Sequence, residues 1–167
     1  MKGIQIIVAI GKNYEIGLDN DLLCYIRPDL QYFKRNTKDQ IVIMGRKTFL
    51  SLPNGPLPHR DNIVITRNDA FSHEGTHVAG SIEESLEIAQ SLNPEGDKKI
   101  FIIGGASIYE QFMPMAEKLY VTHIFESFEA DVFFPPMGDE WVLDSVDVSR
   151  ENIEHEHQHM FAVYKRA

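Results

Sequence analysis

The sequence predicts an α/β protein: a single domain over residues 1–167 with a mostly parallel twisted sheet of about eight strands and flanking helices. Short apolar runs rich in Ile and Val alternate with helical patterns through most of the chain, which is typical of parallel strands joined by helices. Two strand-like runs around a polar turn close the chain. We therefore expect a C-terminal antiparallel hairpin at one edge of the sheet.

Local signals place the individual elements. The predicted strands, where β-prone apolar residues recur, cover residues 4–10, 41–44, 63–66, 77–79, 100–103, 118–124, 141–148 and 159–164. Pro28 suits the first position of a helix that ends near Thr37. Further helices are predicted from Arg46, from the capping box of Ser81 and Glu84 up to residue 92, and over residues 106–113.

Composition excludes several classes of protein. The net charge of −9 at pH 7 argues against a nucleic-acid partner or an anionic membrane surface, because both attract basic proteins. The single cysteine, Cys24, cannot form an internal disulfide and fits a reducing compartment. The sequence has no apolar run of membrane-spanning length and no signal-peptide cleavage pattern. We expect a cytoplasmic protein.

The stretch of residues 98–112 is the central local motif. Its predicted buried strand is followed by Gly104 and Gly105 and then by a helical pattern. The N–H groups and partial positive charge of a helix start suit a phosphate, and glycines let the backbone approach it. The turn lacks the full spacing of a dinucleotide fingerprint, so a tight turn without a ligand is an equal alternative.

Three cations follow predicted strands at their carboxyl ends. Arg46 and Lys47 come just after one strand, and Arg67 follows another. Ligands bind at this edge in open α/β sheets. Together with the diglycine, these loops offer phosphate contacts, to which Thr48 adds a hydroxyl. Solvated loop cations without a ligand are the alternative.

Asp29 is the candidate for proton chemistry. On its predicted helix it shares a face with Leu30 and Phe33, so its carboxylate is expected among apolar groups. Desolvation raises a carboxyl pKa, and such a group can hold or relay a proton near neutral pH. An acidic residue that complements the helix dipole is the simpler alternative. The preceding loop, from Leu22 to Tyr25, carries apolar surface that a ligand could cover.

Two other patterns are assigned no chemistry. His155, His157 and His159 alternate as metal ligands on a strand do, but we expect them on a solvated surface of the C-terminal hairpin. No metal site is therefore expected. Cys24 has no base near it in the sequence, so it is expected to pack as a small hydrophobic residue.

The chain as a whole resembles bacterial dihydrofolate reductases. Matching motifs follow one another along almost its whole length, within residues 16–20, 29–37, 42–49, 56–62, 103–109 and 119–124, and at Asp131, Phe134 and Pro135. The resemblance implies reduction of 7,8-dihydrofolate to 5,6,7,8-tetrahydrofolate by hydride from NADPH. It also implies that the protein binds antifolate inhibitors and is a monomer.

Carried over residue by residue, the resemblance assigns a substrate site. Asp29 would hydrogen-bond the pterin and assist protonation at N5, with Thr122 supporting that contact. Arg60 would bind the α-carboxylate of the substrate's glutamate. The other implied substrate residues are Ile7, Val8, Leu30, Phe33, Leu57 and Ile103.

The resemblance assigns the cofactor to three loops and the start of the following helix. The residues implied around its phosphates, including the 2′-phosphate that separates NADPH from NADH, are Arg46, Lys47, Thr48, Thr66 and Arg67. Gly104 and Gly105 match a diglycine that is joined in the family by a cis peptide. The remaining implied cofactor residues are Ala9, Ile16, Gly45, Ile103, Ala106, Ser107, Ile108, Tyr109 and Gln111. The segment at residues 17–24 would close over the nicotinamide.

The departures from the family pattern concentrate in one place. Most members carry Pro-Trp where this chain has Leu23 and Cys24. The proline usually found two residues before the aspartate is here Pro28, directly before Asp29. Our hypothesis is that Cys24 leaves a roomier cover over the pterin, with altered turnover and altered antifolate binding.

Three alternative functions are open at this point. A reductase of the same fold could act on another heterocycle, as in riboflavin biosynthesis, but it would not need Asp29, Phe33 and Arg60 together. A non-catalytic folate- or nucleotide-binding module would not need both Asp29 and Thr122. A purely structural domain would make the arrangement of the two cation loops and the diglycine a coincidence.

Overall fold

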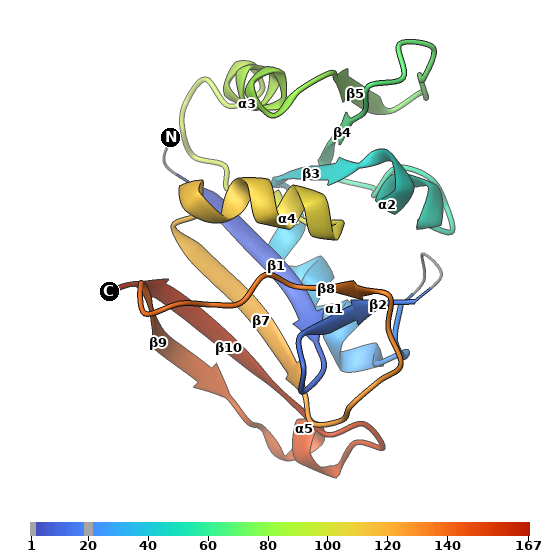
Figure 1. Ribbon diagram of the computed structural model, residues 1–167. Coiled ribbons are helices and arrows are strands. Elements are labelled where there is room, and N and C mark those ends of the chain that lie inside the picture. Colours follow the sequence, from blue (N-terminus) through green and yellow to red (C-terminus); the bar gives the residue numbers. More distant parts are fainter. Residues whose placement is uncertain (1–2, 19–21) are drawn as a thin grey trace.

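A computed structural model describes residues 3–18 and 22–167, which form an eight-stranded and a two-stranded sheet with helices around them (Figure 1). The strands of the larger sheet are β1 (Ile4–Ile10), β3 (Ile41–Gly45), β4 (Asp61–Ile65), β5 (Thr76–Ala79), β6 (Ile100–Ile102), β7 (Lys118–Ile124), β9 (Trp141–Asp147) and β10 (His159–Arg166). The smaller sheet pairs β2 (Glu15–Gly17) with β8 (Val132–Phe133). The helices are α1 (Arg27–Thr37), α2 (Arg46–Ser51), α3 (Ile82–Ser91), α4 (Ala106–Phe112) and α5 (Arg150–Glu154), with a 3₁₀ turn, η1, over Met113–Met115.

The larger sheet has the order β5-β4-β3-β6-β1-β7-β10-β9. The strands from β5 to β7 pair in parallel, whereas β10 pairs antiparallel with both β7 and β9. The predicted parallel sheet with a C-terminal antiparallel hairpin at its edge is therefore confirmed. Strand β6 lies between β3 and β1, as expected for an apolar run that is buried on both faces.

Each face of the sheet has its own hydrophobic core. Successive residues of β3 alternate between them: Ile43 packs with α3 and α4, and Met44 packs with α1 and α2. This alternation explains why β3 is apolar at consecutive positions. Figure 1 shows α4 in front of the sheet and α1 behind it. Helices thus cover both faces of the sheet. The loops that follow β3, β4 and β6 lie at the carboxyl ends of these strands.

Helix α3 begins at the predicted capping residue. The Ser81 hydroxyl accepts a hydrogen bond from the Glu84 N–H at 3.1 Å. The Glu84 carboxylate in turn accepts from the Gly80 N–H at 2.8 Å, one residue earlier than in the standard capping box. The cap signal in the sequence therefore located this helix correctly.

Two short elements were not predicted. The β2–β8 sheet pairs only three residues with two, which is too short for a periodic signal. Helix α5 occupies the first half of the segment expected to be a polar turn. Strand β2 matters for the site, because it immediately follows the turn after β1 and carries Ile16.

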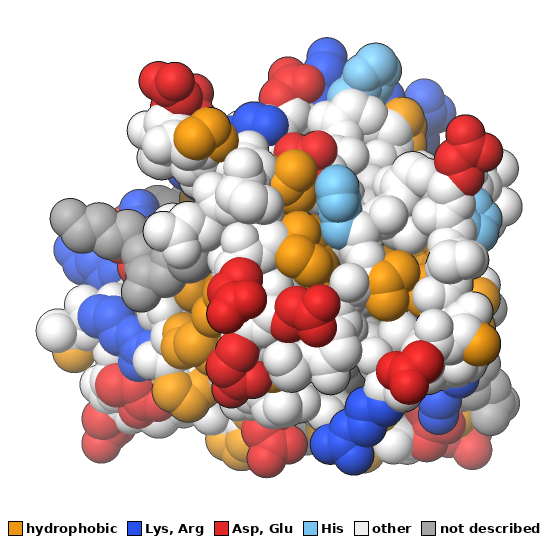
Figure 2. All heavy atoms as spheres, turned by 90° about the horizontal axis from the view of Figure 1, so that it is seen from above, with side chains coloured by type: hydrophobic (Ala, Val, Ile, Leu, Met, Phe, Trp, Pro, Cys, Tyr) orange, Lys and Arg blue, Asp and Glu red, His pale blue; other side chains and the backbone are white. Residues whose placement is uncertain are grey.

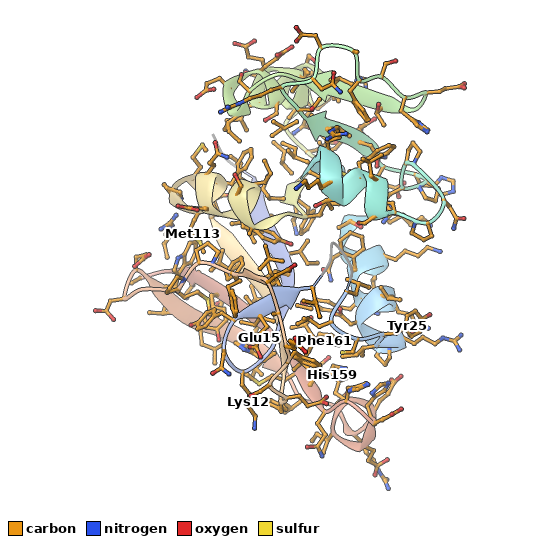
Figure 3. The ribbon with its side chains drawn as sticks, turned by 45° about the vertical axis from the view of Figure 1, so that its right-hand side comes forward. Lys12, Glu15, Tyr25, Met113, His159 and Phe161 are labelled. Atoms are coloured by element: carbon orange, nitrogen blue, oxygen red, sulfur yellow. The ribbon has the colours of Figure 1, made fainter. Side chains whose placement is uncertain are left out.

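The prediction that the three histidines lie on a solvated surface was wrong for His159, whose side chain is fully buried. Strand β10 lies between β7 and β9, so one face of it packs inward, and the His159 ring lies 5.4 Å from the Phe161 ring (Figure 3). The Nδ1 atom of His159 lies 2.7 Å from the His157 carbonyl oxygen. His157 itself lies 2.7 Å from a carboxylate oxygen of Glu126. Among the residues described, no cluster of His, Cys, Asp or Glu has the arrangement of a metal site.

The surface agrees with the acidic composition. On the face seen in Figure 2, acidic side chains spread across the centre, whereas the visible Lys and Arg side chains stand toward the margins. None of the helices within residues 3–18 and 22–167 is long and apolar enough to cross a membrane.

Candidate active site

A cavity lies beside the first turn of α1, where β1, β2 and β7 converge. Its wall is formed by Ala9, Ile16, Leu22, Leu23, Cys24, Ile26, Asp29, Leu30 and Ile124. Four of these were assigned to the site from the sequence: Ala9, Ile16, Asp29 and Leu30. Ile124 was missed, although it lies two residues beyond Thr122 on β7 and so shares its face of the strand. Residues 19–21 of the expected closing segment lie outside the described residues.

Among the described residues that line this cavity, Asp29 is the only acidic one. The buried Thr122 hydroxyl on β7 donates a hydrogen bond to Asp29 Oδ1 at 2.6 Å. Burial raises the pKa of Asp29 above its ordinary value, and the hydrogen bond from Thr122 opposes but does not cancel that effect. The predicted pair is therefore in contact, and its carboxyl group is suited to holding a proton.

Asp29 lies on this wall because it belongs to the first turn of α1. Ile26, which precedes the helix, is buried and accepts hydrogen bonds from the N–H groups of Asp29 and Leu30. Pro28 lies in the first turn, where its missing N–H costs no helical hydrogen bond. The helix thus begins beneath the cavity and directs its first acidic residue toward β7.

Arg60 is held in a fixed orientation next to α1. Its Nε donates to the Pro58 carbonyl at 2.9 Å, and its Nη1 donates to the Thr37 hydroxyl at 3.0 Å. The guanidinium lies 6.0 Å from the centre of the Phe33 ring. A guanidinium has five N–H donors, so these two bonds orient it and leave donors for a carboxylate.

The other predicted substrate residues divide between the two faces of the sheet. Ile7, Phe33, Leu57 and Ile103 pack in the core that contains α1 and α2. The Val8 side chain packs in the opposite core, so Val8 presents only its backbone on the Asp29 side. This follows from the strand periodicity of two residues.

Asn62 is a site residue that sequence reasoning did not assign. It is buried on β4, and its side-chain amide donates to the Leu57 and Arg60 carbonyls at 2.9 and 3.0 Å. Its Oδ1 accepts from the Leu57 N–H at 2.9 Å. Asn62 therefore shapes the loop that carries Leu57 and Arg60.

The predicted phosphate loops meet at one edge of the sheet. The Gly45 N–H donates to the Gly104 carbonyl at 2.8 Å, which joins the end of β3 to the diglycine. Gly45 also pairs with Ile65 at the end of β4, directly before Thr66 and Arg67. Neither Arg46 nor Arg67 forms an ion pair with a residue that the structure describes. Arg46 and Arg67 therefore bring positive charge to this edge of the sheet.

The diglycine has the backbone that the resemblance implied. The Gly104–Gly105 peptide is cis, and Gly104 has a φ of +125°. A Cβ on Gly104 would lie 3.4 Å from the Tyr109 ring and 3.5 Å from the Thr48 hydroxyl. The backbone thus runs closely between α2 and α4.

Helix α4 connects the two halves of the site. The buried Tyr109 hydroxyl donates to the Ile7 carbonyl on β1 at 2.9 Å, and burial raises its pKa, which keeps it protonated. Ile108 packs against Gly45. On the exposed side, the Gln111 amide donates to the backbone and hydroxyl of Ser107 at 3.1 Å. The start of α4, at Ala106, is thereby fixed against both β1 and β3.

Comparison with known proteins identifies the family. The profile of the dihydrofolate reductase family matches residues 3–166. The chain belongs to the dihydrofolate reductase family. It is 37% identical to the enzyme of Staphylococcus haemolyticus over 98% of this chain and 95% of that protein. It is 37% identical to the Bacillus subtilis enzyme over 98% of this chain and 94% of that protein.

A solved structure agrees with this assignment. The dihydrofolate reductase of Enterococcus faecalis, solved in complex with NADP(H) and RAB-propyl, superposes with a TM-score of 0.85. It is 30% identical in sequence, and the match covers 98% of this chain and 95% of that one. The α/β fold and the family expected from the sequence are therefore confirmed.

Cys24 lines the cavity of this dihydrofolate reductase family member where most members are expected to carry tryptophan. Burial, followed by the nearby charges of Glu126 and Asp29, raises the pKa of its thiol to about 11. The residue is therefore a neutral, half-buried part of the wall at physiological pH. This agrees with the expectation that it packs as a small hydrophobic residue.

We expect Cys24→Trp to lower the KM for dihydrofolate severalfold, because the larger ring covers more apolar ligand surface at about 25 cal/mol per Å². Cys24→Ser, which preserves the size of the side chain, is the matched control. Steady-state kinetics measures both variants. An unchanged KM in Cys24→Trp would show that cysteine in place of the family's tryptophan affects only local packing.

Proposed function

We propose that this protein reduces 7,8-dihydrofolate to 5,6,7,8-tetrahydrofolate with NADPH, and that Asp29 assists protonation of the pterin. Membership of the dihydrofolate reductase family supports the reaction. The observation that carries the role of Asp29 is its 2.6 Å hydrogen bond to Thr122 on the wall of the cavity. A hydrogen-bonded carboxyl with a raised pKa can bind an amino-pyrimidine edge and retain a proton.

The residues present fit a phosphorylated dinucleotide. Gly45 and Gly104 lie in close backbone contact, and helices α2 and α4 begin beside them without a side-chain cap. Their first N–H groups are therefore available for phosphate oxygens. Arg46, Lys47 and Arg67 provide charge for additional phosphates, and the Enterococcus faecalis relative binds NADP(H). We propose this edge as the NADPH site, where the bound cofactor supplies hydride.

The chain itself orients the substrate and controls water and protons. Arg60, fixed by Pro58 and Thr37, binds the glutamate carboxylate and so sets how far the pterin enters. Ala9 and Ile16 form an apolar wall that excludes water from the reacting atoms. Asp29, oriented by Thr122, hydrogen-bonds the pterin and assists proton delivery to N5, while hydride is added at C6.

Arg67→Ala should reduce kcat/KM for NADPH roughly tenfold, as expected for the loss of about 1.5 kcal/mol from a charge-assisted phosphate contact. The value for NADH should change little, because NADH lacks the 2′-phosphate. The measurement is dihydrofolate-dependent oxidation of each cofactor. Arg150→Ala, whose exposed guanidinium pairs only with Glu154 among the described residues, is the matched control. An equal loss with both cofactors would remove Arg67 from the 2′-phosphate site.

A further inference from the structure

Glu15 is a buried carboxylate that the proposed reaction does not use. Its side chain is 1% exposed, although Lys12 in the adjoining turn points outward (Figure 3). One carboxylate oxygen accepts from the Asn13 N–H at 2.5 Å, and the other accepts from the Phe128 N–H at 2.6 Å. A single side chain therefore connects the turn after β1 with the segment after β7.

The carboxylate is held in its charged form. Burial by itself would raise the pKa of Glu15, but backbone N–H groups of Phe128, of Glu15 itself and of Asn13 outweigh burial and lower it. None of the ion pairs among the described residues includes Glu15. Burying an anion without a cation is costly unless its oxygens are well hydrogen-bonded. Both oxygens of Glu15 meet that condition through the backbone.

The two connected segments are in close contact. A Cβ on Gly11 would lie 2.8 Å from the Phe128 ring and 3.0 Å from the Glu126 carbonyl oxygen. The Lys12 N–H donates to that same carbonyl at 2.9 Å. The Phe134 N–H donates to the Tyr14 carbonyl at 2.8 Å. Glu15 lies within this contact and fixes its spacing from the inside.

We propose that Glu15 is a positioning residue that fixes strand β2, and through it Ile16, on the wall of the cavity. Ile16 follows Glu15 directly and points into the cavity that Asp29 and Cys24 also line. Hydride transfer depends on how the reacting groups are positioned, and a misplacement of about 1 Å can lower the rate about 10²-fold. The inference rests on the proposed roles of Ile16 and Asp29 in the reaction.

The test variant is Glu15→Gln. Glutamine keeps the size of the side chain but has one acceptor oxygen, so its NH₂ group faces one of the two backbone donors. We expect single-turnover hydride transfer to fall roughly tenfold, as for a small displacement of a positioning group, while the affinity for NADPH stays within about twofold. This separation of rate from affinity is not expected from a general loss of stability.

A second measurement requires no turnover. Cys24 is the only cysteine of the chain and lines the same cavity, so its reaction with a chromogenic disulfide reagent reports access to that wall. The charges that raise its pKa are those of Glu126 and Asp29, not of Glu15. The rate is followed against pH in both proteins, so that a change in the Cys24 pKa is separated from a change in access. A severalfold faster reaction of the Glu15→Gln thiolate therefore reports a moved wall. This result is interpretable even if the proposed reaction itself is not observed.

Asn93→Ala is the matched control. Asn93 also connects a turn through two hydrogen bonds with the backbone of Lys98, both at 3.0 Å, but it lies before β6, away from the cavity. It should lower the melting temperature without changing Cys24 reactivity or hydride transfer. Should Glu15→Gln not fold, Glu15→Asp, which keeps the charge but is too short to reach both donors, is measured in the same way. A lowered melting temperature with Cys24 reactivity and hydride transfer as in the wild type would overturn the proposal.

Discussion

Asp29→Asn is expected to lower kcat/KM for dihydrofolate by roughly 10²–10⁴-fold at neutral pH, the usual contribution of a positioned acid or base. Asparagine preserves the size of the side chain and can still accept the Thr122 hydrogen bond. It cannot exchange a proton with the pterin. Dihydrofolate-dependent oxidation of NADPH measures the loss. Asp144→Asn, a partly exposed carboxylate between Lys118 and Lys165, is the matched control and should retain full activity.

The same substitution should stabilise the protein at neutral pH. Folding raises the pKa of Asp29 above its ordinary value of 3.8. Its favourable contribution to folding is therefore complete only below that value and is lost as pH rises through the folded-state pKa. Asp29→Asn, which does not titrate, should have a higher melting temperature than the wild type at neutral pH and lose that advantage at acid pH. A variant that is inactive because it is misfolded would instead have a lower melting temperature than the wild type at neutral pH.

Gly104→Ala is expected to weaken NADPH binding about tenfold or more and to destabilise the fold. The φ of +125° is unfavourable for any residue with a Cβ, and such strain costs about 1–3 kcal/mol. Relief of that strain moves the backbone between Thr48 and Tyr109, where the added methyl group would lie. Fluorescence titration with NADPH and thermal unfolding measure the two effects.

Gly96→Ala is the matched control, because it introduces a Cβ at a positive φ away from the proposed cofactor site. Gly96 also has a positive φ, +70°, but a Cβ there would have no atom within 4 Å. Both variants should lose stability, and only Gly104→Ala should lose affinity for the cofactor. Equal affinity in the two variants would contradict the placement of NADPH beside the diglycine.

The fold was predictable because most strands of its larger sheet are apolar runs that alternate with helical patterns. The runs that became β1, β3, β6 and β7 carry little besides buried side chains, and their alternation with helical segments fixes parallel pairing. The cation loops followed from the same topology, since parallel strands end at one edge. The pairing of Asp29 with Thr122 came from the family resemblance, because the two residues are far apart in the sequence.

Long-range packing was not predictable from local patterns. An acidic residue in a turn-rich segment normally indicates solvent, yet Glu15 is buried and accepts a hydrogen bond from the N–H of Phe128, which is 113 residues later in the sequence. His159 is buried because β10 lies inside the sheet. Asn62 acts through a loop five residues earlier, and no periodic signal marks such a contact. For Glu15 and His159, the deciding partners are distant in the sequence.

The role of Asp29 in proton delivery is tested most directly by the pH dependence of single-turnover hydride transfer. Protein preloaded with NADPH is mixed with dihydrofolate between about pH 5 and pH 9. Burial raises the pKa of Asp29, so the wild-type rate should fall as pH rises through one ionisation, and Asp29→Asn should lack that ionisation. A wild-type rate that does not change with pH, or the same pH profile in Asp29→Asn, would contradict the assignment of proton delivery to Asp29.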